Sequence, residues 1–444
     1  MSSVFSENLK VYNAEQFKQS ISDLGPTNIY LTIGRVRAWP DDNNPPQANS
    51  SVGTFNDVWQ QMLAAKLITG GDVRHGIRRI NWQSDTAYDQ YHHCTCSLLY
   101  DTSNFYALTT DWNVYKCLSN NAGAVSTVMP TQTIVDAPVE EQDGYVWKYM
   151  YTLSAEERIR FMTDSYIPVR TLTVDNNTLQ WQVQDSAVTG SIDIIRIDNA
   201  GSGYTNANNI VVTITGDGTG ATARAKVNTE TSTLSSITMI NRGSGYTTAT
   251  VTITDNTFGI PGSGAEASVI FPPPGGHGSD PMRELGGSYL ILNPRIRATE
   301  DGKISINNEY RQIAIIQDPI VAGTGNVASN TVYSQVLRLT VSPGAINYVE
   351  DEYVYQGASL ATATFKGLVV DFDSANNILQ LTDTFSDVTS TVLTGANSGA
   401  SRFVESITEK ELRPYTGNLL YVDQIVPIER AADQTEDYKI VLKF

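Results

Sequence analysis

Helical spacing of apolar residues occurs in three short stretches of the first 190 residues. Asn13 is predicted to cap the first helix and Thr54 the second, because short polar side chains satisfy the free amides of a first turn. The first helix carries its apolar residues on one face, namely Phe17, Ile21 and Leu24. Ser154 and Glu157 form a capping-box pattern at the start of the third.

Strand-like runs separate these helices. Residues 28–33 (Asn-Ile-Tyr-Leu-Thr-Ile) and 145–151 (Tyr-Val-Trp-Lys-Tyr-Met-Tyr) are rich in aromatic and β-branched residues, which favour extended structure. The segment also contains every tryptophan of the chain, namely Trp39, Trp59, Trp82, Trp112, Trp147 and Trp181. Large aromatic residues dominate buried cores, so we expect the main folding unit here.

From about residue 191 the pattern changes to a repeat of small residues. The sequence Gly-Ser-Gly-Tyr-Thr occurs twice, and its first glycines, Gly201 and Gly243, lie 42 residues apart. Each copy continues into an alternating strand, at residues 211–215 and 250–254, and then into a glycine-rich turn. Propellers need about four to eight such blades, so two copies predict a paired β module instead.

Further strands are predicted to the end of the chain. A Pro/Gly connector at residues 272–281 closes the first module, and a second light β module follows. The apolar end, residues 438–444, is expected to lie in a sheet. The chain is thus predicted to be mainly β, with three parts: a body of residues 1–190, 279–340 and 409–444, an inserted module at 191–278, and a second at 341–408.

Composition narrows the range of partners. The 444 residues are 41% hydrophobic and only 17% charged, with a net charge of −17, which is typical of a folded acidic protein. No Lys/Arg cluster is visible, so neither nucleic acid nor an anionic membrane is expected as a partner. Three cysteines and no signal-peptide pattern indicate assembly in a reducing cytoplasm.

The strongest candidate for metal chemistry is the run Tyr-His-His-Cys-Thr-Cys at residues 91–96. On a strand, His92, Cys94 and Cys96 would share one face, and Cys117 would be a fourth ligand for zinc. Structural zinc sites usually bring two spaced ligand pairs from separate turns, and the second pair is missing here. We therefore predict no zinc at these residues.

Other motifs have a structural explanation that outweighs the catalytic one. Residues 216–220 (Gly-Asp-Gly-Thr-Gly) lack the Lys-Ser/Thr of a phosphate-binding loop, and a strand is expected to follow. Ala375 stands where a calcium loop beginning at Asp371 and Asp373 needs a ligand. His277 is isolated in the connector. The adjacent carboxylates are read as solvated surface: Glu140, Glu141, Glu156 and Glu157. No catalytic, cofactor-binding or metal residue is assigned.

The order of several local patterns resembles one known family. These patterns are residues 28–39, 77–82, 113–118, 143–149, 310–319 and 433–436. Together they are similar to the baseplate wedge subunit of T-even-type contractile-tailed phages, a dimeric three-layered β-sandwich protein with helix-bearing loops. The two inserted modules lie outside the resemblance. Their small-residue composition, with its Gly-Ser-Gly-Tyr-Thr repeat, resembles that of additional modules on structural proteins of cyanobacterial phages.

The resemblance implies a layered antiparallel β-sandwich body with a few short helices. It also implies a homodimer that binds other wedge proteins within the virion tail baseplate, after assembly in the host cytoplasm. We therefore expect a structural, non-enzymatic subunit. The alternative is a tail-associated carbohydrate-binding or glycan-degrading protein that uses the inserted modules to touch a host surface.

Overall fold

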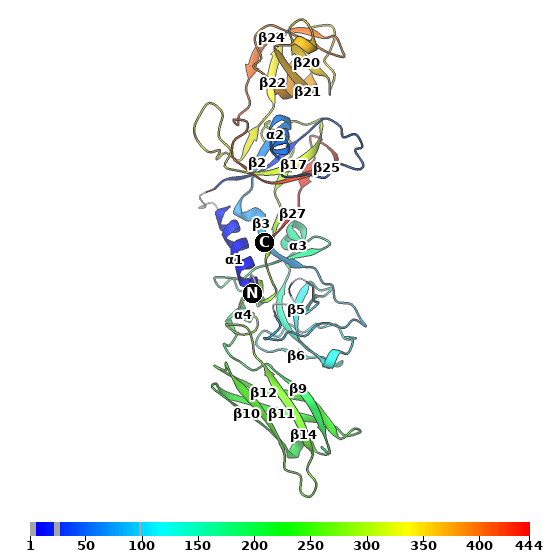
Figure 1. Ribbon diagram of the computed structural model, residues 1–444, viewed down its shortest axis with the longest axis vertical. Helices are drawn as coiled ribbons and strands as arrows, with labels where there is room; N and C mark the ends of the chain where they lie inside the picture. Colours follow the sequence, from blue (N-terminus) through cyan, green and yellow to red (C-terminus); the bar gives the residue numbers. More distant parts are fainter. Residues whose placement is uncertain (1–5, 22–26, 97–99, 101) are drawn as a thin grey trace. The chain divides into compact units, whose positions relative to one another are not determined.

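The computed structural model describes residues 6–21, 27–96, 100 and 102–444, so Leu24 of the predicted first helix lies outside the described residues. The chain divides into two compact units. One comprises Met1–Glu15, Arg74–Ile291 and Val441–Phe444, and the other comprises Gln16–Val73 and Leu292–Ile440. Strands of antiparallel sheets are the main regular structure of both units (Figure 1).

The first unit contains a sheet in the order β4-β5-β7-β6, which we call the aromatic sheet. Its strands are β4 (Tyr106–Leu108), β5 (Asn113–Asn120), β6 (Val139–Glu140) and β7 (Tyr145–Thr152). Nearly every position of β5 and β7 is buried, so both faces of this sheet are covered. On one face Trp147 stacks on Tyr145 with ring centroids 5.6 Å apart and meets the edge of Tyr88 at 5.3 Å.

A second sheet of this unit joins distant parts of the chain, in the order β27-β15-β3-β8. Its strands are β3 (Val73–Arg78), β8 (Tyr166–Val169), β15 (Tyr289–Leu292) and β27 (Ile440–Lys443). The apolar chain end therefore lies in a sheet, as predicted. The α-helices that begin in this unit are α1 (Glu7–Ser20), α3 (Ala155–Phe161), α4 (Leu179–Asp185) and α5 (Pro281–Glu284).

The third part of the first unit, which we call the repeat region (residues 194–270), holds both Gly-Ser-Gly-Tyr-Thr copies. Its strands are β9 (Ile194–Ser202), β10 (Ile210–Gly216), β11 (Thr219–Asn228), β12 (Thr233–Ser244), β13 (Ala249–Asp255) and β14 (Ser263–Ile270). They form one sheet in the order β12-β11-β10-β13 and a pair β14-β9. Alternate residues of β10 and β13 are exposed, and the inward ones are small or β-branched. Both predicted alternating strands are therefore confirmed.

The second unit contains a sheet in the order β18-β2-β1-β17-β25 and a small pair, β16-β26. The strands are β1 (Ile29–Gly34), β2 (Met62–Leu67), β16 (Arg295–Arg297), β17 (Glu309–Gln317), β18 (Val332–Ser334), β25 (Asn418–Glu429) and β26 (Thr435–Asp437). Helix α2 (Val52–Gln61) packs Val58 and Trp59 into the core under this sheet.

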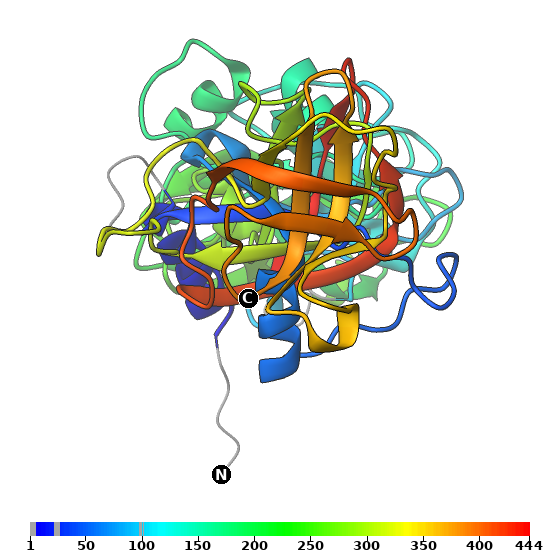
Figure 2. The same cartoon turned by 90° about the horizontal axis from the view of Figure 1, so that it is seen from above.

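The second unit also contains a closed barrel in the order β19-β22-β21-β20-β23-β24. Its strands are β19 (Leu337–Val341), β20 (Tyr353–Gln356), β21 (Phe365–Asp373), β22 (Ile378–Phe385), β23 (Val392–Gly395) and β24 (Ser401–Thr408). In Figure 2 two orange strands cross the golden ones, as strands wrapped around a barrel do. Leucines and valines fill the interior, among them Leu339, Val354 and Leu379.

The prediction of a mainly β chain with antiparallel sheets and a few short helices is confirmed. Two predicted helix starts are wrong. Helix α1 begins at Glu7, so Asn13 lies inside it, and the cap of α2 is Ser51, whose hydroxyl accepts the amide of Thr54. The segments assigned to a single body supply strands to both units, and the division into a body and two inserts stays a prediction.

Candidate functional site

A buried charged cluster lies where the Pro/Gly connector meets the aromatic sheet. Lys116 of β5 points inward, with its Nζ 2.8 Å from Glu284 Oε2 and 3.1 Å from His277 Nδ1. The ring of Tyr91 covers the same ammonium, 4.0 Å from its centroid. Glu284 uses its other oxygen to accept the amide of Gly278 at 2.7 Å. The connector is thereby fixed to β5 by groups that are fully satisfied.

The pKa values of Glu284 and His277 are both shifted by burial and by the neighbouring Lys116. Burial alone would raise the pKa of Glu284, but the neighbouring Lys116 and His277 outweigh it and lower that pKa to about 2. Burial and the charge of Lys116 lower the pKa of His277. The side chains of Lys116 and Glu284 are 0% and 2% exposed, so the pair has no access to substrate and acts on the fold.

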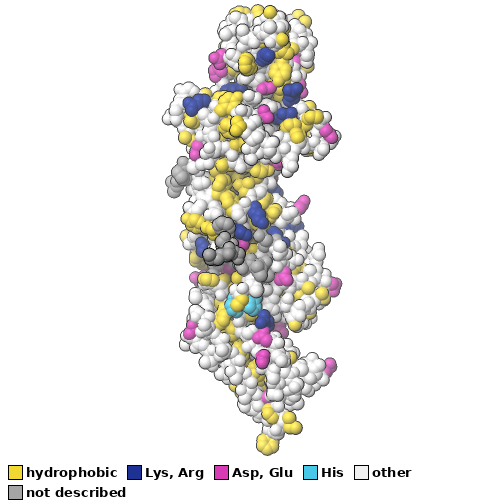
Figure 3. Space-filling view, in the orientation of Figure 1, with side chains coloured by type: hydrophobic (Ala, Val, Ile, Leu, Met, Phe, Trp, Pro, Cys, Tyr) yellow, Lys and Arg dark blue, Asp and Glu magenta, His cyan; other side chains and the backbone are white. Residues whose placement is uncertain are grey.

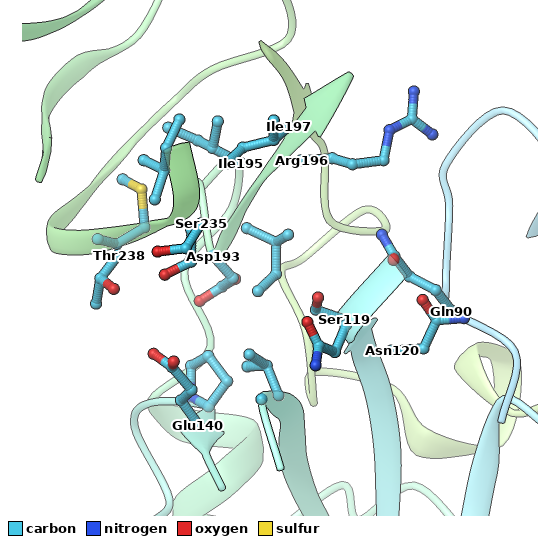
Figure 4. A pocket seen from close by; sticks show the side chains of 18 of the residues that line it. Gln90, Ser119, Asn120, Glu140, Asp193, Ile195, Arg196, Ile197, Ser235 and Thr238 are labelled. Atoms are coloured by element: carbon cyan, nitrogen blue, oxygen red, sulfur yellow. The ribbon is translucent and has the colours of Figure 1, made fainter. Parts of the chain in front are cut away.

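A groove of about 810 Å³ opens between the end of the aromatic sheet and the repeat region. Figure 4 shows Ile195 and Arg196 of β9 on one wall and Ser119 and Asn120 of β5 on the other. Strand β12 contributes residues 235–242, and the loop before β6 contributes Ala137 and Pro138. The lining combines apolar side chains of β9 and β12 with side-chain amides, among them Gln90 and Asn120. Such a lining suits hydrogen bonding to a polypeptide over an apolar floor.

The two carboxylates of the groove are already engaged. Asp193 accepts Arg242 Nη1 and Ser191 Oγ, each at 3.0 Å. Burial would raise the pKa of Asp193, but His277 and Arg242 outweigh it and lower that pKa. Glu140 holds Lys226 Nζ with both oxygens, at 2.9 and 3.0 Å. The lowered pKa of Asp193 is the opposite of the raised pKa that a general acid near neutral pH requires.

Residues 91–96, predicted as a possible strand, form a turn in which the amide of Thr95 bonds the carbonyl of His92. The turn brings together donor atoms of His92, His93 and Cys94, which lie within 4.8 Å of one another. Histidine side chains (cyan) are visible at the surface of the first unit in Figure 3. Cys117 lies apart in the buried aromatic cluster, where burial raises the pKa of its thiol.

The hydrogen bonds of the two histidines oppose metal binding. His92 Nδ1 accepts the amide of Cys94 at 3.2 Å, and His93 Nδ1 accepts the amide of Phe271 at 3.3 Å. In a neutral imidazole the proton then sits on Nε2, which removes the lone pair that a metal needs. A metal-binding histidine normally donates its second nitrogen, which is the reverse of this arrangement.

The remaining sequence candidates occupy structural positions. Residues 217–218 form the turn between β10 and β11, and the strand that follows, β11, is as predicted. Asp373 accepts the amides of Ala375 and Asn376 at 3.0 and 3.1 Å, so its carboxylate closes a turn. Asp371 accepts the side-chain amide of Gln380.

In each of the two adjacent acidic pairs, the two glutamates have different surroundings. Glu157 completes the predicted capping box with Ser154, while Glu156 lies exposed in the first turn of α3. Glu140 is bound to Lys226, and burial together with Asp143 raises the pKa of Glu141.

Sequence reasoning missed the cluster of Lys116, His277 and Glu284. The partners of Lys116 lie 161 and 168 residues away, and a Pro/Gly-rich segment is typical of an exposed linker. The one local signal is a histidine embedded among glycines that leave room for tight packing. The groove was also missed, because it depends on the packing of β9 and β12 beside β5.

Comparison with known proteins gives a partial relationship. No protein-family model matches the chain. It is 26% identical over 175 residues to the baseplate wedge protein gp8 of Enterobacteria phage T4, which covers 32% of this chain and 52% of gp8. The chain thus spans about half the length of the curated relative that it matches. Within the described residues, no helix has both the length and the apolar character needed to span a bilayer. The comparison supports a distant, baseplate-wedge-like relationship.

Proposed function

We propose that this chain is a structural subunit of a phage tail baseplate wedge that bridges neighbouring wedge proteins. The observation that carries the proposal is its partial identity to gp8 of phage T4, a baseplate wedge protein. The densely packed sheets support it, because a bridging subunit needs a rigid frame.

The proposal includes the setting of the subunit. The chain pairs with a second copy, holds other wedge proteins on its outer surfaces, and resides in the virion tail baseplate after assembly in the host cytoplasm. Contractile baseplates change shape on meeting a host, so each subunit moves as a rigid body while its contacts rearrange. Nucleic acid and membrane are not partners, in keeping with the net charge of −17.

The subunit is not an enzyme and holds no resident metal. The groove carboxylates Asp193 and Glu140 are each bound by a cation, and the imidazoles of His92 and His93 use Nδ1 as acceptors. Elemental analysis of the purified protein is expected to find no stoichiometric zinc. One zinc per chain that disappears in the Cys94→Ser variant would overturn the metal part of the proposal.

A cryo-EM map of the parent particle tests the function directly. We expect density in the baseplate that accepts both compact units, with two copies per wedge. Sedimentation of the purified chain is expected to give a dimer. A map that places the chain in the head, the neck or the tail tube contradicts the proposal.

The proposal assigns a peripheral role to the inserted modules at 191–278 and 341–408. Ile194 and Ile270 are direct cross-strand partners, so the chain enters and leaves this segment at neighbouring points and the ends left by its removal can be joined by a short linker. Deletion of residues 195–271 is expected to leave co-assembly with the other wedge proteins intact. Loss of all co-assembly, with hydrogen exchange showing the aromatic sheet still folded, would make the modules central contacts.

A further inference from the structure

The two copies in the repeat region act as internal controls for each other. The hydroxyl of Tyr246 accepts the amide of Ala221, and the hydroxyl of Tyr204 accepts the amide of Ala265, both at 3.3 Å. Each tyrosine ring also lies against one glycine, Gly218 for Tyr246 and Gly262 for Tyr204, with no room for a Cβ. The copies therefore build the same corner from the same residue types.

The copies differ in the loop that leads into this corner. Between Thr215 of β10 and Gly218 lie two residues, whereas between Thr254 of β13 and Gly262 lie seven. The first copy shows that the corner closes without the extra five residues. The extension in the second copy therefore needs an explanation other than the fold.

The base of the longer loop is held by several hydrogen bonds. The Asp255 carboxylate accepts the amides of Thr257 and Gly262, at 2.9 and 2.8 Å. The amide of Asn256 bonds the carbonyl of Asn209 at 2.9 Å, which ties the loop to the neighbouring turn. These bonds fix where the tip of the loop projects.

The tip carries two fully exposed large apolar side chains. Phe258 is 103% exposed and Ile260 is 88% exposed, while among the other described residues no large hydrophobic side chain exceeds the 75% of Val52. In Figure 3 hydrophobic side chains (yellow) gather at the end of the repeat region. An apolar pair presented on a firmly held loop is a feature of surfaces that become covered on binding.

We propose that residues 255–263 form a docking loop whose Phe258 and Ile260 side chains insert into an apolar recess on a tail protein outside the wedge. This rests on the proposed baseplate function and names a further contact of the subunit, separate from its contacts with the other wedge proteins. The recess buries both side chains.

The charge of the region favours a protein recess over a lipid surface. Residues 249–264 contain no Lys or Arg, and residues 191–271 contain six carboxylates against four Lys or Arg side chains. Peripheral insertion into bacterial membranes relies on cations beside the apolar residues, since anionic lipids would repel this acidic region.

The test measures binding of the full chain to each purified tail protein of the parent phage by biolayer interferometry. One variant carries Phe258→Ser with Ile260→Ser, and a second replaces residues 255–261 with the Gly-Asp of the shorter copy. Val52→Ser is the matched control for loss of an exposed apolar side chain in the other unit. Circular dichroism should be unchanged in all three variants, and thermal unfolding should be unchanged in the two serine variants, because their altered side chains lie outside the core.

We expect both loop variants to bind one tail protein at least ten-fold more weakly, with their other affinities and all those of Val52→Ser unchanged. Unchanged affinity for every tail protein overturns the docking loop while leaving the baseplate function standing. The docking loop is also overturned if the wild-type chain binds phosphatidylcholine/phosphatidylglycerol vesicles and the loop variants lose that binding while keeping every tail-protein affinity. That result would favour a lipid surface. A wild-type chain that binds no tail protein overturns the proposed function and the docking loop with it.

Discussion

The aromatic sheet and the repeat region belong to one compact unit, yet they are held together in different ways. Strands β5 and β7 bury nearly every side chain, and Tyr88, Tyr145 and Trp147 pack as one cluster. Strands β10 and β13 expose every second residue, and most of their inward side chains are only half-buried. The aromatic sheet therefore depends on packed volume, whereas the repeat region depends on backbone geometry at its corners.

This difference explains the composition of the two regions. A large aromatic residue contributes far more buried apolar area than alanine or valine, so a few of them stabilise a small sheet. The repeat region compensates with glycines that allow positive φ and with two tyrosines whose hydroxyls accept backbone amides. Substitutions that remove side-chain volume should therefore destabilise mainly the aromatic sheet. Substitutions that add a Cβ to a glycine should destabilise mainly the repeat region.

The largest expected effect is on the aromatic sheet. Trp147→Ala leaves a cavity between Tyr88 and Tyr145 and should reduce the stability of this sheet by about 3–5 kcal/mol. Hydrogen exchange of the β5 and β7 amides measures that loss locally. Trp181→Ala, at a half-buried tryptophan of α4, is the control and should cost less than half as much. Equal losses in the two variants would contradict the role given to packed volume.

A smaller effect is expected from a single methyl group in the repeat region. Gly243 has φ +62°, and a Cβ there would lie 2.5 Å from the Thr219 carbonyl oxygen, so Gly243→Ala should cost about 2–3 kcal/mol. Gly245 has φ +75° with no atom closer than 4.0 Å, and its alanine variant should cost only about 1–2 kcal/mol. Exchange of the β11 and β12 amides distinguishes them. Similar losses would show that the close approach is unimportant.

The smallest expected effect is a pH dependence that belongs to the aromatic sheet. Burial lowers the pKa of Lys148 on β7 to about 8, while the unfolded chain keeps the ordinary value near 10.5. Between these values the unfolded state binds more protons, so stability rises with pH, by about 1 kcal/mol from pH 8 to 9. Lys148→Met should remove this rise. Lys226→Met, at an exposed ion pair of the repeat region, should leave it in place.

Features set by neighbouring residues were predictable from the sequence. The capping box of Ser154 and Glu157 is present, and the runs at 28–33 and 145–151 correspond to β1 and β7. The cap of α2 was misplaced because Ser51 and Thr54 are both capping residues three positions apart, and only the fold selects between them. The start of α1 was missed because the helix already begins at Glu7, and Asn13 takes a helical conformation inside it instead of capping it.

Most of the candidate site could not be predicted from neighbouring residues. Nothing around Lys116 indicates that its charge is met by Glu284, which lies 168 residues further along the chain. Potential metal ligands do gather within residues 91–96, but the group is His92, His93 and Cys94, without the Cys96 and Cys117 of the predicted set. His93 joins the group because these residues turn instead of extending. The groove depends on the positions of three strands, which no single segment encodes.

The sheet β27-β15-β3-β8 has a consequence for synthesis of the protein. Its last strand, β27, ends one residue before the end of the described chain, while β3 begins at Val73. Domains fold as their residues leave the ribosome, so β15 lacks this neighbouring strand until residues 440–443 have been made. A chain that stops short of these residues would present the backbone edge of β15 to proteases and to wrong strand partners. The order of the strands thus makes β27 a condition for a finished sheet.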